Sequence, residues 1–352
     1  MTDPQLIDRA VRLLQAGELV ALPTETVYGL GADAANPAAV AKIFAAKGRP
    51  ADHPLIVHIA GADYLERWAQ AIPDVAWELA ETFWPGPLTL ILPRSPLAGD
   101  AVTGGQDTVG LRVPGHPVAL QLLRAFAAAG GEGIAAPSAN RFGRISPTEA
   151  AHVRAELGEG EGSMLPLILD GGPCTVGIES TILDLSRMAT VGPVLLRPGH
   201  ISPQQLALVL GVEPLPSHTG ANNKNSGKDS SKDHAPRVSG SLDAHYAPQT
   251  PLKIVAPARL LDYLNVVRHR GSRCAALCHS QPPHAGMPHA WRMLPADPAG
   301  YAHELYAALR ELDATGAETI VVEAIPSRPE WAAVADRLRR AAAGAGGGAY
   351  NP

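Results

Sequence analysis

Hydrophobic positions in the first two hundred residues alternate between helical spacing and short apolar runs. Ile7, Ala10, Val11 and Leu14 recur every three or four residues, and this spacing predicts a helix that ends before Gly17. Further along, apolar runs bounded by polar or turn-forming residues predict strands. These runs cover residues 19–22, 55–60, 88–92, 109–113, 165–169, 180–185 and 194–197.

Helical patterns separate several of these strands, which is typical of an α/β domain. We therefore expect a mixed, twisted sheet with flanking helices over residues 1–212. Residues 217–237 break the pattern because they contain almost no apolar side chain and are rich in Gly, Asn, Ser and Lys. Such a segment cannot bury enough surface to offset the entropy of ordering it, so we predict a flexible linker over residues 213–250.

A second alternation of strands and helices follows the linker. Apolar runs predict strands at 252–256, 274–278, 291–294 and 319–324, and helices begin near Pro257, Pro298 and Arg328. This order predicts a smaller, Rossmann-like three-layer domain over residues 251–352. Because it contains no GxGxxG fingerprint, we expect no dinucleotide site there.

The composition and charge of the chain exclude several classes of protein. Of the 352 residues, 46% are hydrophobic and 18% charged, which excludes global disorder. No apolar run reaches the roughly 18–20 residues that span a bilayer, and the N-terminal residues lack a signal-peptide pattern, so we expect no membrane association. Three cysteines without a CxxC pair indicate a reduced, cytoplasmic protein without a cysteine-rich zinc site. The net charge of −5 argues against a broadly basic surface for nucleic acid.

Six segments of the first domain carry polar residues that a plain core would not need. They are PTETVYGLGADA at 23–34, AKGRPADHPLIVHI at 46–59, TVGLRVPGHP at 108–117, APSANRFGRISPTEA at 136–150, GIESTILDL at 177–185 and LLRPG at 195–199. They supply several cations and many hydroxyls but no paired carboxylates, and the chain lacks GxSxG, HExxH and Walker lysine motifs. This inventory favours binding of a polyanion and an amino acid over hydrolysis by a protein nucleophile.

Structural roles are an alternative for several of these residues. Ser146 followed by Glu149 matches a capping box, although a cap at a helix N-terminus can also face a phosphate. Ser202 begins a second capping box, which we interpret as structural. Lys47 and Arg49 lie where a helix ends, so they could simply interact with its dipole, and we expect both side chains to be exposed.

Two further positions combine charge or polarity with apolar neighbours. His58 alternates with apolar residues on a strand and could be a core histidine. Arg112 lies inside an apolar strand, where a half-buried arginine needs an anionic partner, and Glu179 could supply it. Five other histidines lie in turn-rich stretches, where we expect them to be solvated and not to form a metal site: His218, His234, His279, His284 and His289.

Taken in order, the six segments resemble the threonylcarbamoyl-AMP synthase family. The first domain is similar to its YrdC-like domain, and the second domain, with SLDAHYAP at 241–248, resembles the two-domain form of these enzymes. The resemblance implies a nucleotidyltransferase that makes L-threonylcarbamoyladenylate and pyrophosphate from L-threonine, bicarbonate or CO2, and ATP. The adenylate then serves threonylcarbamoyladenosine modification of tRNA.

The resemblance also implies roles for the matching residues. Lys47 and Arg49 would be catalytic, by stabilising charge on the phosphates of ATP. Arg112 would pair with the carboxylate of threonine. The residues around threonine would be Thr26, His58, Arg112 and Ser180, and those around ATP would be Lys47, Arg49, His53, Thr108, Ser138, Asn140, Ser146, Arg197 and Tyr246.

The linker departs from one common family pattern, which starts with Pro-Gly-Met and has a basic residue before His-Tyr. Here residues 239–244 read Ser-Gly-Ser-Leu-Asp-Ala before His245 and Tyr246. We expect the segment around Tyr246 to close over the nucleotide as a lid, with Pro248 stiffening its exit into the second domain.

The resemblance implies magnesium as a companion of ATP, held largely by phosphate oxygens and water. A tRNA-modifying threonylcarbamoyl transferase would accept the adenylate, and a weak contact with tRNA would be compatible with this role. One rival is an RNA-binding YrdC-like module without synthase activity, which the acidic chain disfavours. Another is carbamoyl transfer in hydrogenase maturation, whose proteins carry an acylphosphatase-like region and zinc-finger cysteines that this chain lacks.

Overall fold

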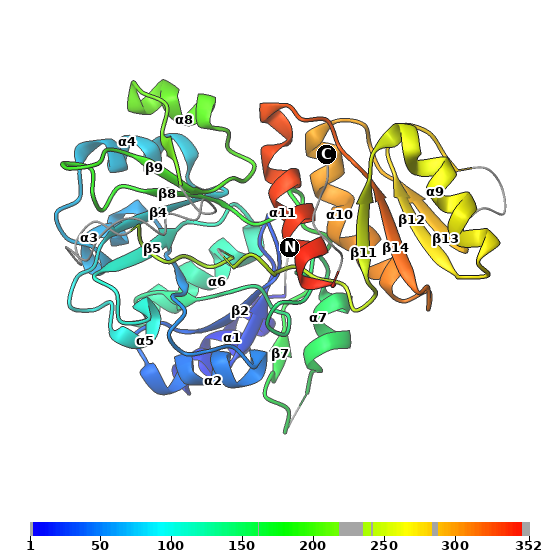
Figure 1. Cartoon of the computed structure of the whole chain (residues 1–352). Helices are drawn as coiled ribbons and strands as arrows, with labels where there is room; N and C mark the ends of the chain where they lie inside the picture. Colours follow the sequence, from blue (N-terminus) through cyan, green and yellow to red (C-terminus); the bar gives the residue numbers. More distant parts are fainter. Residues whose placement is uncertain (1–2, 161, 218–234, 241, 284–287, 347–352) are drawn as a thin grey trace.

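The computed structural model describes residues 3–160, 162–217, 235–240, 242–283 and 288–346. It contains two sheets, the larger on the left and the smaller on the right of Figure 1. The strands of the larger sheet are β1 (Val20–Leu22), β2 (Gly29–Asp33), β3 (Ile56–His58), β4 (Leu88–Pro93), β5 (Thr108–Arg112), β6 (Ile134–Ala135), β7 (Leu167–Ile168), β8 (Thr181–Asp184), β9 (Val194–Arg197) and β10 (Leu215–Pro216).

The larger sheet is mixed, with the strand order β10-β9-β8-β4-β5-β3-β6-β2-β1-β7. β3 is parallel to β5 and β4 is parallel to β8, whereas β4 and β5 are antiparallel. The predicted mixed sheet is therefore confirmed, and its seven predicted strands are present within one or two residues of the expected bounds. The short β6 and β10 and the glycine-containing β2 had not been predicted. Gly31 is needed in β2 because a Cβ there would lie only 2.9 Å from side-chain carbons of Leu22 and Ile134.

The helices of the first domain begin and end at side-chain signals that the sequence carries. Asn36 accepts hydrogen bonds from the first turn of its helix, and Gly48, with a left-handed φ of 62°, ends it. Ser202 forms the predicted capping box.

Among the described residues, no helix is both long and apolar enough to cross a membrane. The helices are α1 (Pro4–Gln15), α2 (Pro37–Lys47), α3 (Leu65–Trp68), α4 (Asp74–Phe83), α5 (Asp100–Thr103), α6 (Pro117–Ala128), α7 (Ala150–Leu157) and α8 (Pro203–Leu210), with a 3-10 turn η1 (Ala62–Tyr64).

The second domain has the predicted three layers. Its strands are all parallel, in the order β11-β14-β12-β13, for β11 (Leu252–Val255), β12 (Cys274–Cys278), β13 (Ala290–Met293) and β14 (Thr319–Glu323). Alternate residues of β12 face opposite sides, as expected for a buried strand. Cys274, Ala276 and Cys278 pack with α9 (Pro257–His269), while Ala275 and Leu277 share a core with α10 (Pro298–Asp313) and α11 (Ala332–Gly344), which follows η2 (Pro329–Trp331).

One histidine of this domain departs from expectation. His279 was expected to be solvated, but it is buried beyond the end of β12, with Nδ1 3.2 Å from Glu323 Oε2. That carboxylate also accepts hydrogen bonds from the backbone of His279 and Ser280, which explains why the turn folds inward. His289 is exposed. The other three, His218, His234 and His284, lie outside the described residues.

The two domains share an apolar core. Val27, Ile145 and Ile178 of the first domain belong to the same buried cluster as the residues of α10 and α11. Figure 1 shows both helices between the two sheets, on the side of the smaller sheet that faces the first domain. Gly177, with φ of 81°, permits a close approach of the two backbones, because a Cβ there would overlap the backbone carbonyls of Ala302 and His303. The second domain therefore packs closely against the first.

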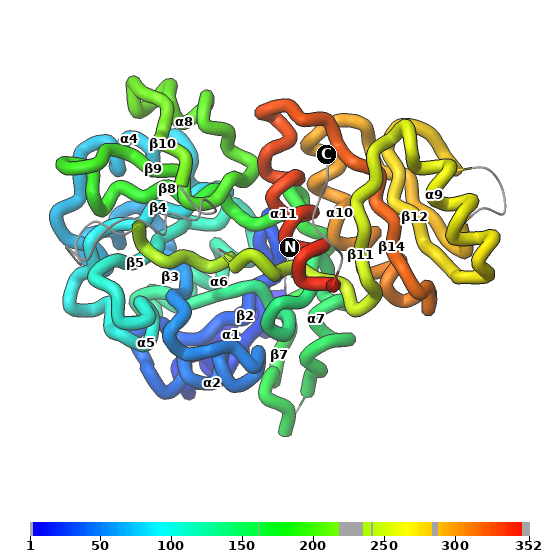
Figure 2. The backbone as a smooth tube through the Cα atoms, viewed as in Figure 1, coloured from blue at the N-terminus to red at the C-terminus, as the bar shows by residue number. Residues whose placement is uncertain are grey.

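The segment between the domains crosses the surface of the first domain (Figure 2). The predicted flexible linker falls partly on residues 218–234, which lie outside the described residues. After them, Arg237 exchanges two hydrogen bonds with the side chain of Gln106, at 2.7 and 3.1 Å. At the other end, the backbone N–H groups of Gln249 and Thr250 both donate to Asp313, each at 2.8 Å. Between these two points the Ser239 hydroxyl donates to the Pro54 carbonyl at 3.0 Å, just before β3, so this stretch packs on the first domain.

Candidate active site

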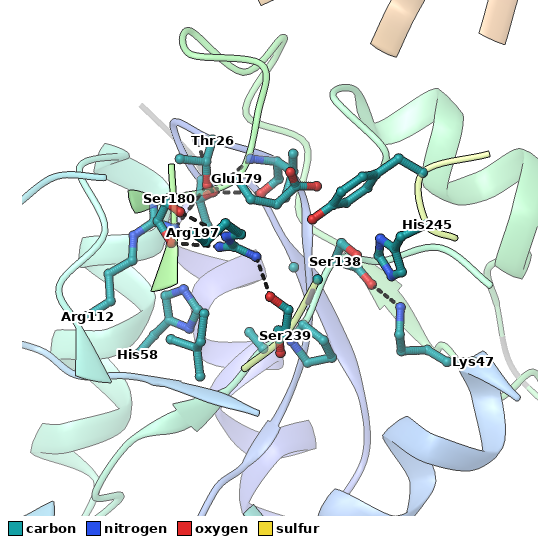
Figure 3. Close-up of a pocket in the computed structure, with 18 of the residues that line it drawn as sticks. Thr26, Lys47, His58, Arg112, Ser138, Glu179, Ser180, Arg197, Ser239 and His245 are labelled. Atoms are coloured by element: carbon teal, nitrogen blue, oxygen red, sulfur yellow. Dashed lines mark hydrogen bonds between the residues drawn. The ribbon is translucent and has the colours of Figure 1, made fainter. Parts of the chain in front are cut away.

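A pocket lies under this segment, lined by residues of the six polar segments of the sequence and of the linker (Figure 3). Its enclosed volume is about 50 Å³. Most of the predicted site residues line it, although the sequence separates them by up to 220 positions. These are Thr26, Lys47, Arg49, His58, Arg112, Ser138, Ser180, Arg197 and Tyr246.

One end of the pocket is built around Arg112, which lies opposite His58 in the register of β5 and β3. The Arg112 side chain is buried, and its Nη1 donates to the Thr26 hydroxyl at 3.0 Å. Its Nη2 lies 2.7 Å from Glu25 Oε1. The anionic partner required by a buried arginine is therefore Glu25, and the expectation that Glu179 supplies it is wrong.

His58 and Ser180 complete this end of the pocket. Burial, followed by the charge of Arg112, lowers the pKa of His58 to about 3, so its imidazole is neutral. Its Nδ1 is buried without a hydrogen-bond partner among the described residues. The Ser180 hydroxyl lies 2.8 Å from that of Thr89 and accepts a hydrogen bond from Arg197 at 3.1 Å. The result is a compact set of hydroxyls beside one arginine and one neutral histidine.

The opposite end of the pocket is built around Lys47, the last residue of α2. Its ammonium donates to the carbonyl of Ser138 at 2.5 Å (Figure 3) and to that of Asn140 at 2.6 Å. Lys47 and Arg49 are 4% and 8% exposed, so the expectation that they are surface charges is wrong. The loop that contains Ser138 folds over them. Burial, and next the neighbouring charge of Arg49, lowers the pKa of Lys47 to about 7.

Arg49 and the linker are joined by a row of rings. The Arg49 guanidinium lies 5.9 Å from the centre of the Phe142 ring, and Phe142 meets the edge of His245 at 6.0 Å. His245 in turn meets Tyr246 at 4.1 Å. Arg49 also donates to the Ser239 hydroxyl at 3.2 Å. Through these contacts the linker forms a wall of the pocket.

Arg197 lies between the two ends of the pocket (Figure 3). It donates to the backbone carbonyl of Ser180 at 3.0 Å and to that of Ser239 at 2.9 Å. Arg197 therefore links Ser180, at the Arg112 end of the pocket, to Ser239 of the linker, which also contacts Arg49. Burial lowers the pKa of Arg197, since a desolvated charge is disfavoured.

Four predicted residues do not line the pocket. His53 stacks edge-on against Phe142, which does line it, at 5.4 Å, and Asn140 donates through its side chain to the carbonyls of Arg141 and Arg144. Thr108 lies at the end of β5 opposite to Arg112. Ser146 donates to Glu179 Oε1 at 2.6 Å, and α7 begins only at Ala150 with Glu149 at its cap, so the capping-box interpretation of Ser146 is wrong.

Some lining residues had not been predicted. Phe142 lies inside one of the recognised segments and could have been found by asking which neighbours of a motif residue share its loop. Ser239, Gly240 and His245 belong to the linker. The predicted lid around Tyr246 accounts for His245, but nothing in the sequence singles out Ser239 and Gly240.

The electrostatics of the pocket favour an anion. Lys47, Arg49, Arg112 and Arg197 line it, against the single carboxylate of Glu179. Among the residues that the structure describes, no three His, Cys, Asp or Glu side chains gather as metal ligands. A polyanion would restore interactions that these four cations lose when they are removed from water.

Comparisons with known proteins cover both domains. A family described as "Telomere recombination", which groups Sua5, YciO and YrdC proteins, matches residues 12–199, and a family described as "Threonylcarbamoyl-AMP synthase, C-terminal domain" matches residues 201–343. A threonylcarbamoyl-AMP synthase of Bacillus subtilis is 41% identical over 349 residues, which cover 97% of this chain and 94% of that protein. A synthase of the same name from Pyrococcus abyssi is 39% identical over 340 residues, covering 94% and 92%.

A solved structure has the same two-domain architecture. The crystal structure of P. abyssi Sua5 complexed with L-threonine matches with a TM-score of 0.83 and 37% identity, covering 96% of this chain and 94% of that chain. The matched length includes both sheets and the segment between them. The chain therefore belongs to the threonylcarbamoyl-AMP synthase family, the ATP-using nucleotidyltransferases of threonylcarbamoyladenosine modification in tRNA.

Proposed function

We propose that this pocket makes L-threonylcarbamoyladenylate, with threonine at the Arg112 end and ATP at the Lys47 end. The observation that carries the proposal is that residues suited to an amino acid and residues suited to a triphosphate lie at different ends of one pocket. The hydroxyls of Thr26 and Ser180, the neutral His58 and Arg112 lie at one end, while Lys47 lies at the other (Figure 3). Arg49 lies beside Phe142, which meets His245 near Lys47 (Figure 3). An amino acid needs the first set, and a triphosphate needs the second.

At the threonine end, Arg112 pairs with the substrate carboxylate in place of, or beside, Glu25. Thr26 and Ser180 offer hydroxyls to the polar atoms of threonine. The unpartnered Nδ1 of His58 accepts a hydrogen bond from its hydroxyl or amine, because a neutral imidazole can accept at one nitrogen. That the P. abyssi crystal is a complex with L-threonine supports this assignment.

The reaction needs no covalent enzyme intermediate. The amine of threonine attacks CO2 and loses a proton, which gives a carbamate. A carboxylate oxygen of the carbamate then attacks the α-phosphorus of ATP, and the bond to the β-phosphate breaks as pyrophosphate leaves. Lys47, Arg49 and Arg197 hold the phosphates and stabilise the negative charge in the transition state.

Magnesium fits this site only as a companion of ATP. Glu179 is the one carboxylate that lines the pocket, and its oxygens are already engaged by Ser146 and Arg337. Phosphate oxygens and water would therefore supply most of the ligands, as magnesium prefers. The ion would neutralise phosphate charge beside Lys47 and Arg49.

The adenylate passes to a threonylcarbamoyl transferase in the cytoplasm. The synthase itself makes at most weak contact with tRNA.

The linker acts as a lid. The cavity of about 50 Å³ is narrow beside a typical ligand pocket, and in this proposal the stretch that carries Ser239 and Tyr246 moves to admit ATP. The Tyr246 hydroxyl is buried without a hydrogen-bond partner among the described residues, which suits a contact with substrate. Closure over ATP would exclude water and protect the labile adenylate.

Product analysis tests the proposed function directly. Incubation with ATP, L-threonine and bicarbonate should yield threonylcarbamoyladenylate and pyrophosphate, identified by mass spectrometry. Omission of any one substrate should abolish the adenylate. Retained binding of RNA with no adenylate under any condition would instead favour the RNA-binding module.

Arg112→Ala should weaken threonine binding by about a hundredfold or more, because breaking a buried charge pair typically costs about 3–5 kcal/mol. ATP affinity should change little. Calorimetric titration measures both. Arg94→Ala is the matched control, since Arg94 pairs with Asp100 on the surface beyond β4 and does not line the pocket. An unchanged threonine affinity in Arg112→Ala, also with Glu25→Gln in the same chain, would remove Arg112 from this role.

ATP binding should take up a proton at about pH 8, because Lys47 is then mostly neutral in the free protein and a triphosphate favours its charged form. At about pH 6 Lys47 is already protonated, so affinity should fall as the pH rises above 7. Titration in buffers of different ionisation enthalpy measures this uptake. Lys47→Met should abolish it, whereas Lys42→Met, on the exposed side of the same helix, should not. Equal uptake in both variants would contradict the assignment.

Tyr246→Ala should lower the yield of adenylate and raise the ratio of pyrophosphate released to adenylate recovered, because an open pocket lets water reach the intermediate. Tyr246→Phe keeps the ring and should retain closure, so its ratio should stay near that of the unmodified protein. Pyrophosphate and adenylate are quantified in the same reaction. A normal ratio in Tyr246→Ala would show that the segment is only a tether.

A further inference from the structure

Arg337 of α11 reaches from the second domain into the first and is completely buried. Its Nε donates to Glu179 Oε2 at 2.8 Å, and its Nη2 donates to the Glu179 carbonyl at 3.3 Å. Its Nη1 donates to the Pro198 carbonyl at 3.0 Å. Glu179 directly precedes Ser180, and Pro198 directly follows Arg197. One side chain of the second domain therefore holds the backbone beside two residues that line the pocket.

The carboxylate that Arg337 meets is shared between the domains. Glu179 Oε2 also accepts from the hydroxyl of Tyr306 on α10 at 3.0 Å, and Oε1 accepts from Ser146 at 2.6 Å. Burial alone would raise the pKa of Glu179, but Arg337, Arg197 and the Ser146 hydrogen bond lower it to about 2. The carboxylate is thus ionised and fixed from both sides.

Arg337 also supports the lid. Its guanidinium lies 5.3 Å from the centre of the Tyr246 ring, and the centre of the Tyr306 ring lies 5.7 Å from that of Tyr246. Tyr246 has a φ of 61°, which is uncommon for a residue other than glycine and is kept only where the surroundings fix it. Arg337 and Tyr306 supply part of those surroundings.

We propose that Arg337 is a positioning residue through which the second domain completes the active site. It orients Ser180 through Glu179, Arg197 through Pro198, and Tyr246 through its own guanidinium. The second domain then acts on both substrates without an active site of its own. This inference rests on the proposed function for the identity of the two substrates, while the contacts themselves do not depend on it.

A simpler role for Arg337 would be a buried ion pair that only stabilises the fold. The chain offers such a pair in Arg187 and Asp184, at the other end of β8, where Arg187 donates to the Asp184 carboxylate at 2.9 and 3.0 Å. Neither residue lines the pocket. Arg337 differs because its donors end on residues that adjoin the pocket, as well as on a carboxylate.

Substrate affinity separates these two roles. A variant that is only destabilised has fewer folded molecules, so its apparent kcat falls while KM and Kd stay unchanged. A variant with a misaligned pocket binds its substrates more weakly. We expect Arg337→Met to raise the Kd of threonine and of ATP by about tenfold or more, since small displacements of positioned groups cost this much. Arg337→Lys keeps the charge but cannot reach all these acceptors, so it should restore only part of the affinity.

Three further variants complete the design. Arg187→Met tests the loss of a partly buried pair away from the pocket, and Arg292→Met tests a cation of the second domain that is 41% exposed and pairs with Glu311. Both should leave KM and Kd unchanged, whatever their melting temperatures. If Arg337→Met does not fold, the double variant Glu179→Gln with Arg337→Met removes the unpaired carboxylate and should recover stability without recovering affinity.

The measurements are threonine and ATP titrations by calorimetry, KM and kcat for adenylate formation, and thermal melting. Unchanged Kd and KM in every folded Arg337 variant would overturn the proposal, and so would full recovery of affinity in the double variant. Absence of adenylate from the unmodified protein would instead count against the proposed function. The calorimetric comparison decides the role of Arg337 in either case.

Discussion

The burial of positive charge is the constraint on which the rest of this structure depends. Lys47, Arg49, Arg112 and Arg197 are each less than 9% exposed around one pocket, although the chain as a whole is acidic. Removing a cation from water is costly, and each must be compensated by a carboxylate, a carbonyl or a ring. The lowered pKa of Lys47 shows that its compensation is incomplete. If ATP binds here as proposed, its phosphates would complete this compensation, and the imbalance that costs stability would then contribute to the binding energy.

This constraint explains the arrangement of loops around the sheet. Carbonyls of the loop at Ser138 and Asn140 converge on Lys47, and Glu25 turns inward to meet Arg112. Neither arrangement would be stable around an apolar side chain, because the polar groups would then be buried without partners. The second domain contributes to the same balance through Arg337, which keeps Glu179 ionised at the border of the pocket.

The fold and most of the pocket could be predicted from the sequence because apolar periodicity and contiguous motifs are local signals. The partners of charged residues could not. The pattern around Arg112 indicates burial but not which carboxylate lies nearby, and Glu25 takes that position while Glu179 faces the other domain. Likewise, the sequence around Ser146 fits a capping box, yet a hydrogen bond to Glu179 removes that hydroxyl from α7. The sequence around Lys47 predicts an exposed helix end, but a loop that is distant in the chain covers this residue. Each error concerns a contact between residues far apart in the chain.

The attachment of the linker at both ends has a consequence for how the enzyme opens. Arg237 is held by Gln106 on the first domain, and Gln249 and Thr250 are held by Asp313 on the second. If this stretch is the lid proposed above, opening it means breaking contacts such as those of Ser239 with Arg49 and Arg197. The core that the two domains share lies outside these contacts. The proposed opening would then be a local change in the linker, without a rotation of one domain against the other.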